Sequence, residues 1–194
     1  DRIYRYMDRF NLNYKQTAID LTYAHTKQIL KNQITIAFYD ITTLYFEASD
    51  EDDLRKTGFS KDGKAQNPQI LLGLLVSTDG HPLAYEIFEG DKYEGYTLIP
   101  VVQAFKKKYK LPSLIIVADA GLLSADNITE LIRLNYPFIL GARIKNETEV
   151  IKQQIASQTY TDGKTITIHK KNNIRLIVNY SRKRAKKDTP LRKQ

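Results

Sequence analysis

Two aspartates end runs of the sequence that are typical of β-strands. Asp40 completes the alternating series Ile34, Ile36, Phe38, and Asp119 ends the continuous apolar run "LIIVAD". A carboxylate that faces a hydrophobic core costs several kcal/mol unless something compensates for it. A metal ion, a hydrogen-bonding network or a simple turn would each do so.

Paired carboxylates suit a hard divalent cation. Oxygen ligands alone favour Mg²⁺ or Mn²⁺ over zinc. Two carboxylates that lie close together repel each other, and a divalent cation between them makes the interaction favourable. The histidines His25, His81 and His169 are scattered and lack metal-ligand spacing, so we expect none of them to be a ligand.

An alternation of strands and helices would bring the two aspartates together. The pattern predicts strands over 34–46, 69–78, 83–90, 114–119 and 137–143, with helices over 93–109 and after an N-cap at Ser124. If the first three strands form an antiparallel meander and the first of these helices crosses right-handedly, the fourth strand lies parallel to the first. Asp40 and Asp119 would then end neighbouring strands at one edge of a mixed sheet, where α/β proteins place their active sites.

The flanking segments indicate three parts. Residues 1–33 form a helical lead-in with one helix, whose expected apolar stripe is Tyr14, Ala18, Leu21, His25 and Ile29. Residues 34–145 form the α/β core, and 48–69 read as a long loop within it. Residues 146–194 begin with a helix capped by Asn146 and Glu149 and continue into a β-ribbon, "KTITIHK" and "IRLIVNY", and a basic segment.

Composition is that of a globular protein, with 42% hydrophobic and 27% charged residues in 194. No apolar run reaches the length of a membrane span, and the absence of cysteine is compatible with the cytosol. The net charge is +8, and residues 181–194 hold seven Lys or Arg against one Asp. A polyanionic partner and a merely solvated helix are both consistent with that segment.

Three phrases carry a family resemblance: "YDITTLYFEA", "GFSKDGKAQNPQILLGLLVSTDGHPLAYEIFEGDKYEGYTLIPVV" and "IIVADAGLLSADNITELI". Together they resemble the catalytic core of DDE insertion-sequence transposases, a bacterial group whose ribonuclease H-like fold is interrupted by a β-rich insertion. The resemblance runs from Ile34 to Arg143, and weakly through "YSRKRAKKD". It implies an α/β, ribonuclease H-like mixed sheet, in which an antiparallel meander precedes parallel strands with helices, plus the start of the β-rich insertion.

The resemblance also implies a chemistry. Asp40 and Asp119 match the first two members of the Asp-Asp-Glu triad, which holds two catalytic Mg²⁺ or Mn²⁺ ions for phosphodiester hydrolysis and strand transfer. The implied partner is double-stranded DNA at transposon ends and target, bound by a homodimer in the bacterial cytoplasm. Four basic residues are expected to position phosphates: Lys61, Lys64, Arg143 and Lys145.

The sequence departs from the family pattern at several positions. Ala120 and Leu122 replace the usual Arg and Met beside the glycine, and Asp91 replaces an Asn. Glu147 and Glu149 come too early to be the third carboxylate, so that residue is expected beyond Gln194 and the chain is expected to be a core fragment.

Three other interpretations use the same residues. Asp40 also fits the nucleophile of a haloacid-dehalogenase-like phosphatase, although that family has a second Asp where this chain has Thr42, and a crossover where a hairpin is predicted here. A catalytically inactive DNA-binding module, with the aspartates as turn residues, is the non-enzymatic alternative. The near P-loop "GFSKDGKA" lacks the Ser or Thr that would bind magnesium, because Ala65 stands there.

Overall fold

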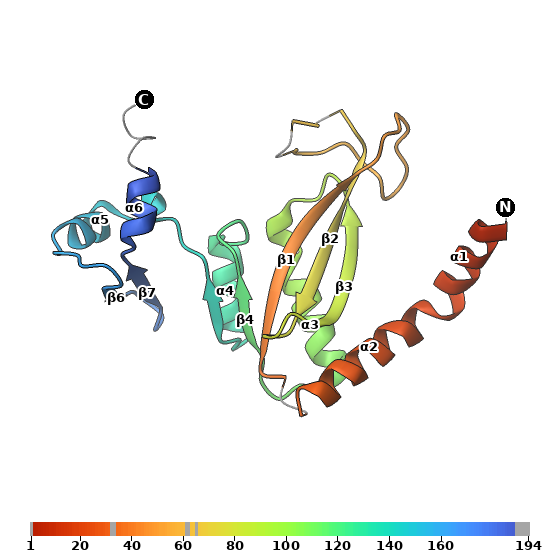
Figure 1. Cartoon of the computed structure of the whole chain (residues 1–194), viewed down its shortest axis with the longest axis horizontal. Coiled ribbons are helices and arrows are strands. Elements are labelled where there is room, and N and C mark those ends of the chain that lie inside the picture. The colour runs from red at the N-terminus through yellow and green to blue at the C-terminus, as the bar shows by residue number, and fades with distance from the viewer. Residues whose placement is uncertain (1, 32–33, 61–62, 65, 189–194) are drawn as a thin grey trace. The chain divides into compact units, whose positions relative to one another are not determined.

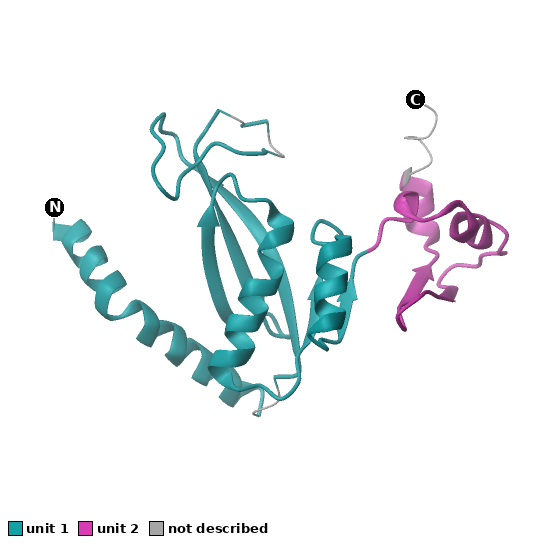
Figure 2. Ribbon diagram, turned by 180° about the vertical axis from the view of Figure 1, so that it is seen from behind, with its two compact units in different colours: residues 1–141 teal, residues 142–194 magenta. Residues whose placement is uncertain are grey.

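The computed structural model describes residues 2–31, 34–60, 63–64 and 66–188, except for the side chain of Asp188. The chain divides into two compact units, residues 1–141 and 142–194, which Figure 2 colours separately. Lys61 lies outside the described residues, so its expected role as a phosphate contact has no structural counterpart.

The first unit is built on a five-stranded mixed sheet with the order β3-β2-β1-β4-β5. β1 pairs antiparallel with β2, and β2 with β3, whereas β4 is parallel to both β1 and β5. The predicted meander and the parallel fourth strand are therefore confirmed, and the fold class is the mixed, ribonuclease H-like α/β sheet. The strands are β1 (Ile36–Tyr45), β2 (Gln69–Val76), β3 (Pro82–Glu89), β4 (Ile115–Ala118) and β5 (Phe138–Leu140) (Figure 1).

Helices cover one face of this sheet. α3 (Leu98–Tyr109) and α4 (Ala125–Arg133) lie in front of the strands in Figure 2, and α3 contributes four buried apolar side chains to the core. The opposite face is open among the described residues of this unit. Four of its apolar side chains are between 37% and 61% exposed: Phe38, Leu44, Leu74 and Ile139.

The helices of the core begin where their caps allow. Ser124 is the N-cap of α4, as predicted, because its hydroxyl accepts a hydrogen bond from the Asn127 N–H at 3.0 Å. The helix expected over 93–109 is divided: a 3₁₀ turn, η1 (Glu94–Tyr96), precedes α3. No helix in the described part of the chain is long and apolar enough to cross a membrane.

The lead-in differs from its prediction. Two helices precede the sheet instead of one, α1 (Arg2–Asn13) and α2 (Lys15–Ile29), and α1 has no buried residue. The buried residues of α2 are Tyr23 and Thr26, whereas Leu21 of the predicted stripe is 66% exposed. The reason is tertiary: the Tyr23 ring stacks on Tyr109 of α3, with 3.5 Å between centroids.

The second unit packs a helix against a two-stranded ribbon. After the 3₁₀ turn η2 (Ile144–Asn146) come α5 (Glu149–Ala156), β6 (Thr165–His169), β7 (Arg175–Asn179) and α6 (Arg182–Asp188). The predicted ribbon is confirmed as an antiparallel pair. The predicted cap of α5 is wrong by two residues, because Thr148, not Asn146, accepts the hydrogen bond from the Ile151 N–H.

Candidate active site

Asp40 lies inside strand β1, not at its end. The strand continues to Tyr45, and Asp40 pairs with Leu74 of β2. The pairing of β1 with β4 does end here, since its last pair is Tyr39 with Ala118. Asp40 is therefore the first residue of β1 beyond the parallel ladder, and Asp119 is the first residue after β4.

The register places both carboxylates on one face. In a parallel pair, residues in register share a face, and successive residues alternate between faces. Tyr39 and Ala118 are buried toward the helices, so Asp40 and Asp119 both point to the open face, where both are exposed. Asp40 does not face the core, so no burial cost has to be compensated.

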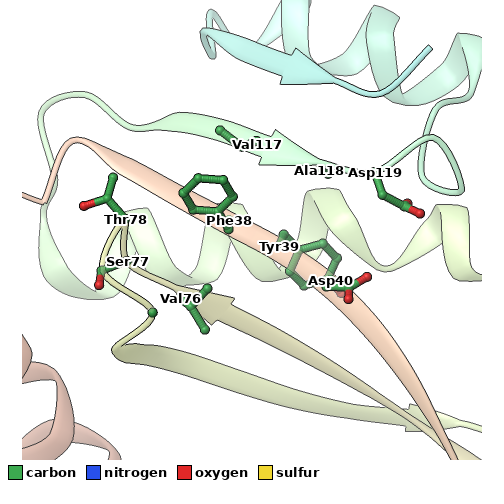
Figure 3. Close-up of a pocket in the computed structure, with 10 residues that line it drawn as sticks. Phe38, Tyr39, Asp40, Val76, Ser77, Thr78, Val117, Ala118 and Asp119 are labelled. Atoms are coloured by element: carbon green, nitrogen blue, oxygen red, sulfur yellow. The ribbon is translucent and has the colours of Figure 1, made fainter. Parts of the chain in front are cut away.

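The two aspartates line one hollow on the open side of the sheet (Figure 3). It has a volume of about 590 Å³. Its wall comes from the first half of β1, the end of β4 and the turn between β2 and β3. The lining residues are Phe38, Tyr39, Asp40, Val76, Ser77, Thr78, Gly80, Val117, Ala118 and Asp119. No Lys or Arg of the described chain is among them, so the negative charge of the two carboxylates is not neutralised by a lining side chain.

Backbone amides hold one oxygen of each carboxylate. Asp40 Oδ1 accepts a hydrogen bond from the Ile41 N–H at 2.9 Å, and Asp119 Oδ1 accepts one from the Gly121 N–H at 2.8 Å. No described residue donates to Oδ2 of either aspartate. Each carboxylate is thus oriented through one oxygen and keeps the other for a ligand.

The loop that carries Asp119 is tied to the rest of the unit. The buried Asn127 amide donates to the carbonyls of Leu122 and Gly95, at 2.9 and 2.8 Å. Gly141 lies directly against this loop, because a Cβ on it would stand 2.7 Å from the Ala120 nitrogen. These contacts fix the backbone on which Asp119 sits.

Tyr39 precedes Asp40 in β1, and its side chain is buried on the opposite face of the sheet, toward the helices. It is 2% exposed, and burial raises the pKa of its hydroxyl to about 12, so the ring is neutral at ordinary pH. Its hydroxyl fits against Gly73 of β2, where a Cβ would come within 2.4 Å of the oxygen. The sequence analysis did not single out Tyr39, although its alternation with Asp40 on β1 is the signal that could have found it.

The remaining expected site residues lie elsewhere. Lys64 does not line the hollow; its ammonium stands 5.5 Å from the centroid of the Tyr45 ring. Arg143 and Lys145 belong to the second unit. Among the described residues, no group of three Asp, Glu, His or Cys could hold a metal ion, so the structure supplies two carboxylates and not three.

Sequence reasoning also missed the β2–β3 turn as part of the hollow. Ser77, Thr78 and Gly80 line it because Val76 pairs with Phe38, which brings the turn beside the beginning of β1. Leu122, one of the departures from the family pattern, is 2% exposed and belongs to the core.

Comparison with solved structures finds similar proteins. A piggyBac transposase, seen in a synaptic complex with hairpin DNA, is similar over 77% of this chain and 31% of its own, with 13% identity and a TM-score of 0.52. A Mos1 transposase in a paired-end complex with the left transposon end is similar over 74% of this chain and 54% of its own, with 14% identity and a TM-score of 0.38. No protein-family model and no curated protein sequence matches the chain.

The comparison with the piggyBac protein establishes a shared fold. At 13% identity it carries no residue-level correspondence. The chain spans about a third of the length of that protein and about half of the Mos1 chain. The chemistry of the hollow has to be argued from its own residues.

Proposed function

We propose that this chain is part of the catalytic region of a DDE-type, insertion-sequence transposase, with Asp40 and Asp119 as carboxylates of a metal-dependent site. The observation that carries the proposal is the register of β1 and β4, which sets the two residues side by side on the open face of the sheet. The fold shared with piggyBac transposase supports it, and so do the three phrases that resemble insertion-sequence transposases.

The donor set fits magnesium or manganese. Both side chains offer hard oxygen ligands, no nitrogen or sulfur ligand lines the hollow, and each aspartate keeps Oδ2 free of donors among the described residues. Two divalent cations held here would activate the attacking oxygen and stabilise the leaving oxygen at a phosphodiester. Asp40 and Asp119 would hold the ions.

The residues themselves have simple roles in this scheme. The two carboxylates bind and orient, and the backbone amides of Ile41 and Gly121 fix the directions of their oxygens. A third carboxylate, which the described residues do not supply to the hollow, would complete the set. Lys64, Arg143 and Lys145 would contact phosphates without reading bases.

The substrate that follows is double-stranded DNA, at transposon ends and at a target, acted on by a homodimer in the bacterial cytoplasm. The antiparallel pairing of β1 with β2 disfavours the haloacid-dehalogenase-like alternative, whose first strand should lead into a crossover or a helical cap. Turnover of a small phosphoester such as p-nitrophenyl phosphate would favour that alternative and contradict the proposal.

Strand cleavage tests the proposal. The full product of the gene is incubated with supercoiled plasmid and Mn²⁺, and nicked product is measured. Asp40→Asn and Asp119→Asn should each reduce nicking to background, because each removes a ligand charge without changing side-chain volume. Asp8→Asn, which removes an exposed carboxylate of α1 outside the hollow, is the matched control. Nicking that survives either active-site substitution refutes the proposal. DNA binding without nicking by the unsubstituted protein would favour the inactive DNA-binding module.

A further inference from the structure

The two units differ sharply in charge. The second unit, residues 142–194, holds fourteen Lys or Arg against four Asp or Glu, a net charge of +10 in 53 residues. The first unit holds sixteen Lys or Arg against eighteen Asp or Glu, a net charge of −2. The basic character of the protein therefore belongs to the second unit as a whole, and not only to its last residues. A unit of this charge attracts a polyanion.

The β6–β7 ribbon of this unit has two unlike faces. Its inner face closes a small core, in which Ile168, Leu176 and Val178 pack with partly buried residues of α5. The outer face alternates with the inner one, and every side chain on it is exposed. The outer-face residues are the cross-strand pairs Thr165 with Asn179, Thr167 with Ile177 and His169 with Arg175.

The outer face is free of carboxylates because the acids of the unit are used elsewhere. Glu147, before α5, pairs with Lys170 at 2.8 Å. Glu149, on α5, pairs with Lys152 at 2.8 Å. Asp162, before β6, accepts a hydrogen bond from the Arg182 N–H at 2.7 Å. Among the side chains described in this unit, these three acids are the complete set.

We propose that the outer face of the β6–β7 ribbon is a docking surface for duplex DNA and enters its major groove. The major groove of B-form DNA, about 12 Å wide, admits a two-stranded ribbon, whereas the major groove of A-form RNA is too deep and narrow for side chains to read. The face offers the groups that contact base edges: threonine hydroxyls, an imidazole, a guanidinium and the aliphatic Ile177, which is 61% exposed.

Cations at the ribbon ends would meet the phosphates on either side of the groove. Lys171 stands in the turn between the strands, where Asn172 and Asn173 adopt positive φ angles and Lys170 and Ile174 close the turn by a 2.8 Å hydrogen bond. At the opposite end of the ribbon, α6 follows β7 and carries exposed cations: Arg182, Lys183, Arg184, Lys186 and Lys187. The inference rests on the proposed function only in taking DNA as the polyanion; it does not depend on Asp40 or Asp119.

Fluorescence anisotropy with a labelled 24-base-pair DNA duplex of random sequence tests the surface, using the whole chain. The critical comparison is Ile177→Asp against Val150→Asp. Both replace an exposed β-branched side chain of the second unit with a carboxylate, and both lower its charge by one; Val150, 74% exposed, lies on α5 and not on the ribbon. We expect Ile177→Asp to weaken binding by about tenfold or more, the size expected when a contact in a DNA interface is lost, and Val150→Asp by about twofold at most.

A second pair of variants controls for loss of binding through misfolding. Ile177→Lys should tighten binding and Val150→Lys should change it little, and a gain of affinity does not arise from an unfolded protein. Arg175→Ala should also lower the slope of log affinity against log salt by about one, the value for one lost phosphate or base-edge cation.

Three results would overturn the inference. The first is an equal loss of DNA affinity in the two Asp variants, which would mean that net charge alone drives binding. The others are a larger loss of affinity in Val150→Asp, and tighter binding of a duplex RNA of the same length than of the DNA. The two proposals are tested by different measurements: nicking reports on Asp40 and Asp119, and anisotropy without divalent cations, compared between Ile177→Asp and Val150→Asp, reports on the ribbon. If the Asp40 and Asp119 variants lose nicking but the ribbon variants bind DNA like the unsubstituted chain, only the docking surface is refuted.

Discussion

Replacing Asp119 with Asn should strongly weaken the binding of Mn²⁺ to the first unit. The substitution keeps the shape of the side chain and removes one ligand charge from a hollow that holds only two. It leaves Asp40 with its hydrogen bond from the Ile41 N–H in place. The variant therefore shows how much the Mn²⁺ affinity of two carboxylates exceeds that of one.

The expected size follows from the exposure of the site. Because Asp119 is exposed, the dielectric constant of water applies, and a unit charge about 4 Å from a divalent cation then interacts by about 2 kcal/mol. Since about 1.4 kcal/mol corresponds to tenfold in an equilibrium constant, affinity should fall by about thirtyfold. Direct coordination of Mn²⁺ by Oδ2 would make the loss larger, so thirtyfold is a lower estimate.

Paramagnetic broadening of backbone amide signals during a Mn²⁺ titration measures both affinity and position. In the unsubstituted chain, broadening should centre on residues 38–41 and 117–121, and Asp119→Asn should shift the midpoint to higher Mn²⁺. The acidic loop at residues 50–53 is the competing site, but Asp52 already accepts hydrogen bonds from Arg55 and Glu51 from Thr57. Broadening centred on that loop, or a midpoint that changes by less than twofold, would refute the reasoning.

Three further predictions concern the scaffold of the site. Burial raises the pKa of Tyr39 from 10.0 to about 12, so the folded state keeps this proton longer than the unfolded state, and stability should fall by about 2 to 3 kcal/mol between pH 10 and pH 12. In Tyr39→Phe, the free energy of unfolding measured in urea should not show this decrease between pH 10 and pH 12. A decrease equal to that of the unsubstituted chain would show that the buried hydroxyl is not its source. Ser124→Ala should lower the free energy of unfolding by about 1 kcal/mol, because the Asn127 N–H loses its acceptor; Ser157→Ala, after α5, is the control, and equal effects would contradict the cap. Gly141→Ala should both lower the melting temperature and weaken Mn²⁺ binding, since its Cβ would collide with the loop after Asp119. A change in only one of the two would show that the conformation of this loop does not determine Mn²⁺ binding.

Local patterning was sufficient to predict most elements of the core. Alternating and continuous apolar runs located β1 to β5, and Ser124 marked the start of α4. Handedness and strand-pairing rules then led to the parallel partnership of β1 with β4, because few other topologies satisfy them. The aspartates could be selected from sequence for the same reason: each follows a run whose geometry is nearly fixed.

The faces of these elements could not be predicted in the same way. Period-2 alternation divides β1 into two sides but does not say which side the helices cover. The side that carries Phe38 and Asp40 is the exposed one. The same is true of α2, where Leu21 and Tyr23 are both plausible core residues. Tyr23 is buried because Tyr109, 86 positions along the chain, lies under it.

The sequence by itself determined the strands, their order and the two acidic positions. Only the tertiary structure decided that both carboxylates open onto one solvent-facing hollow, and that the β2–β3 turn forms part of its wall. The physical reason is that propensity and periodicity act over a few residues, whereas the choice of buried face depends on apolar surface contributed by segments distant in sequence. The hollow follows from that choice, because α3 and α4 cover the Tyr39 side of β1 and leave the Asp40 side to solvent.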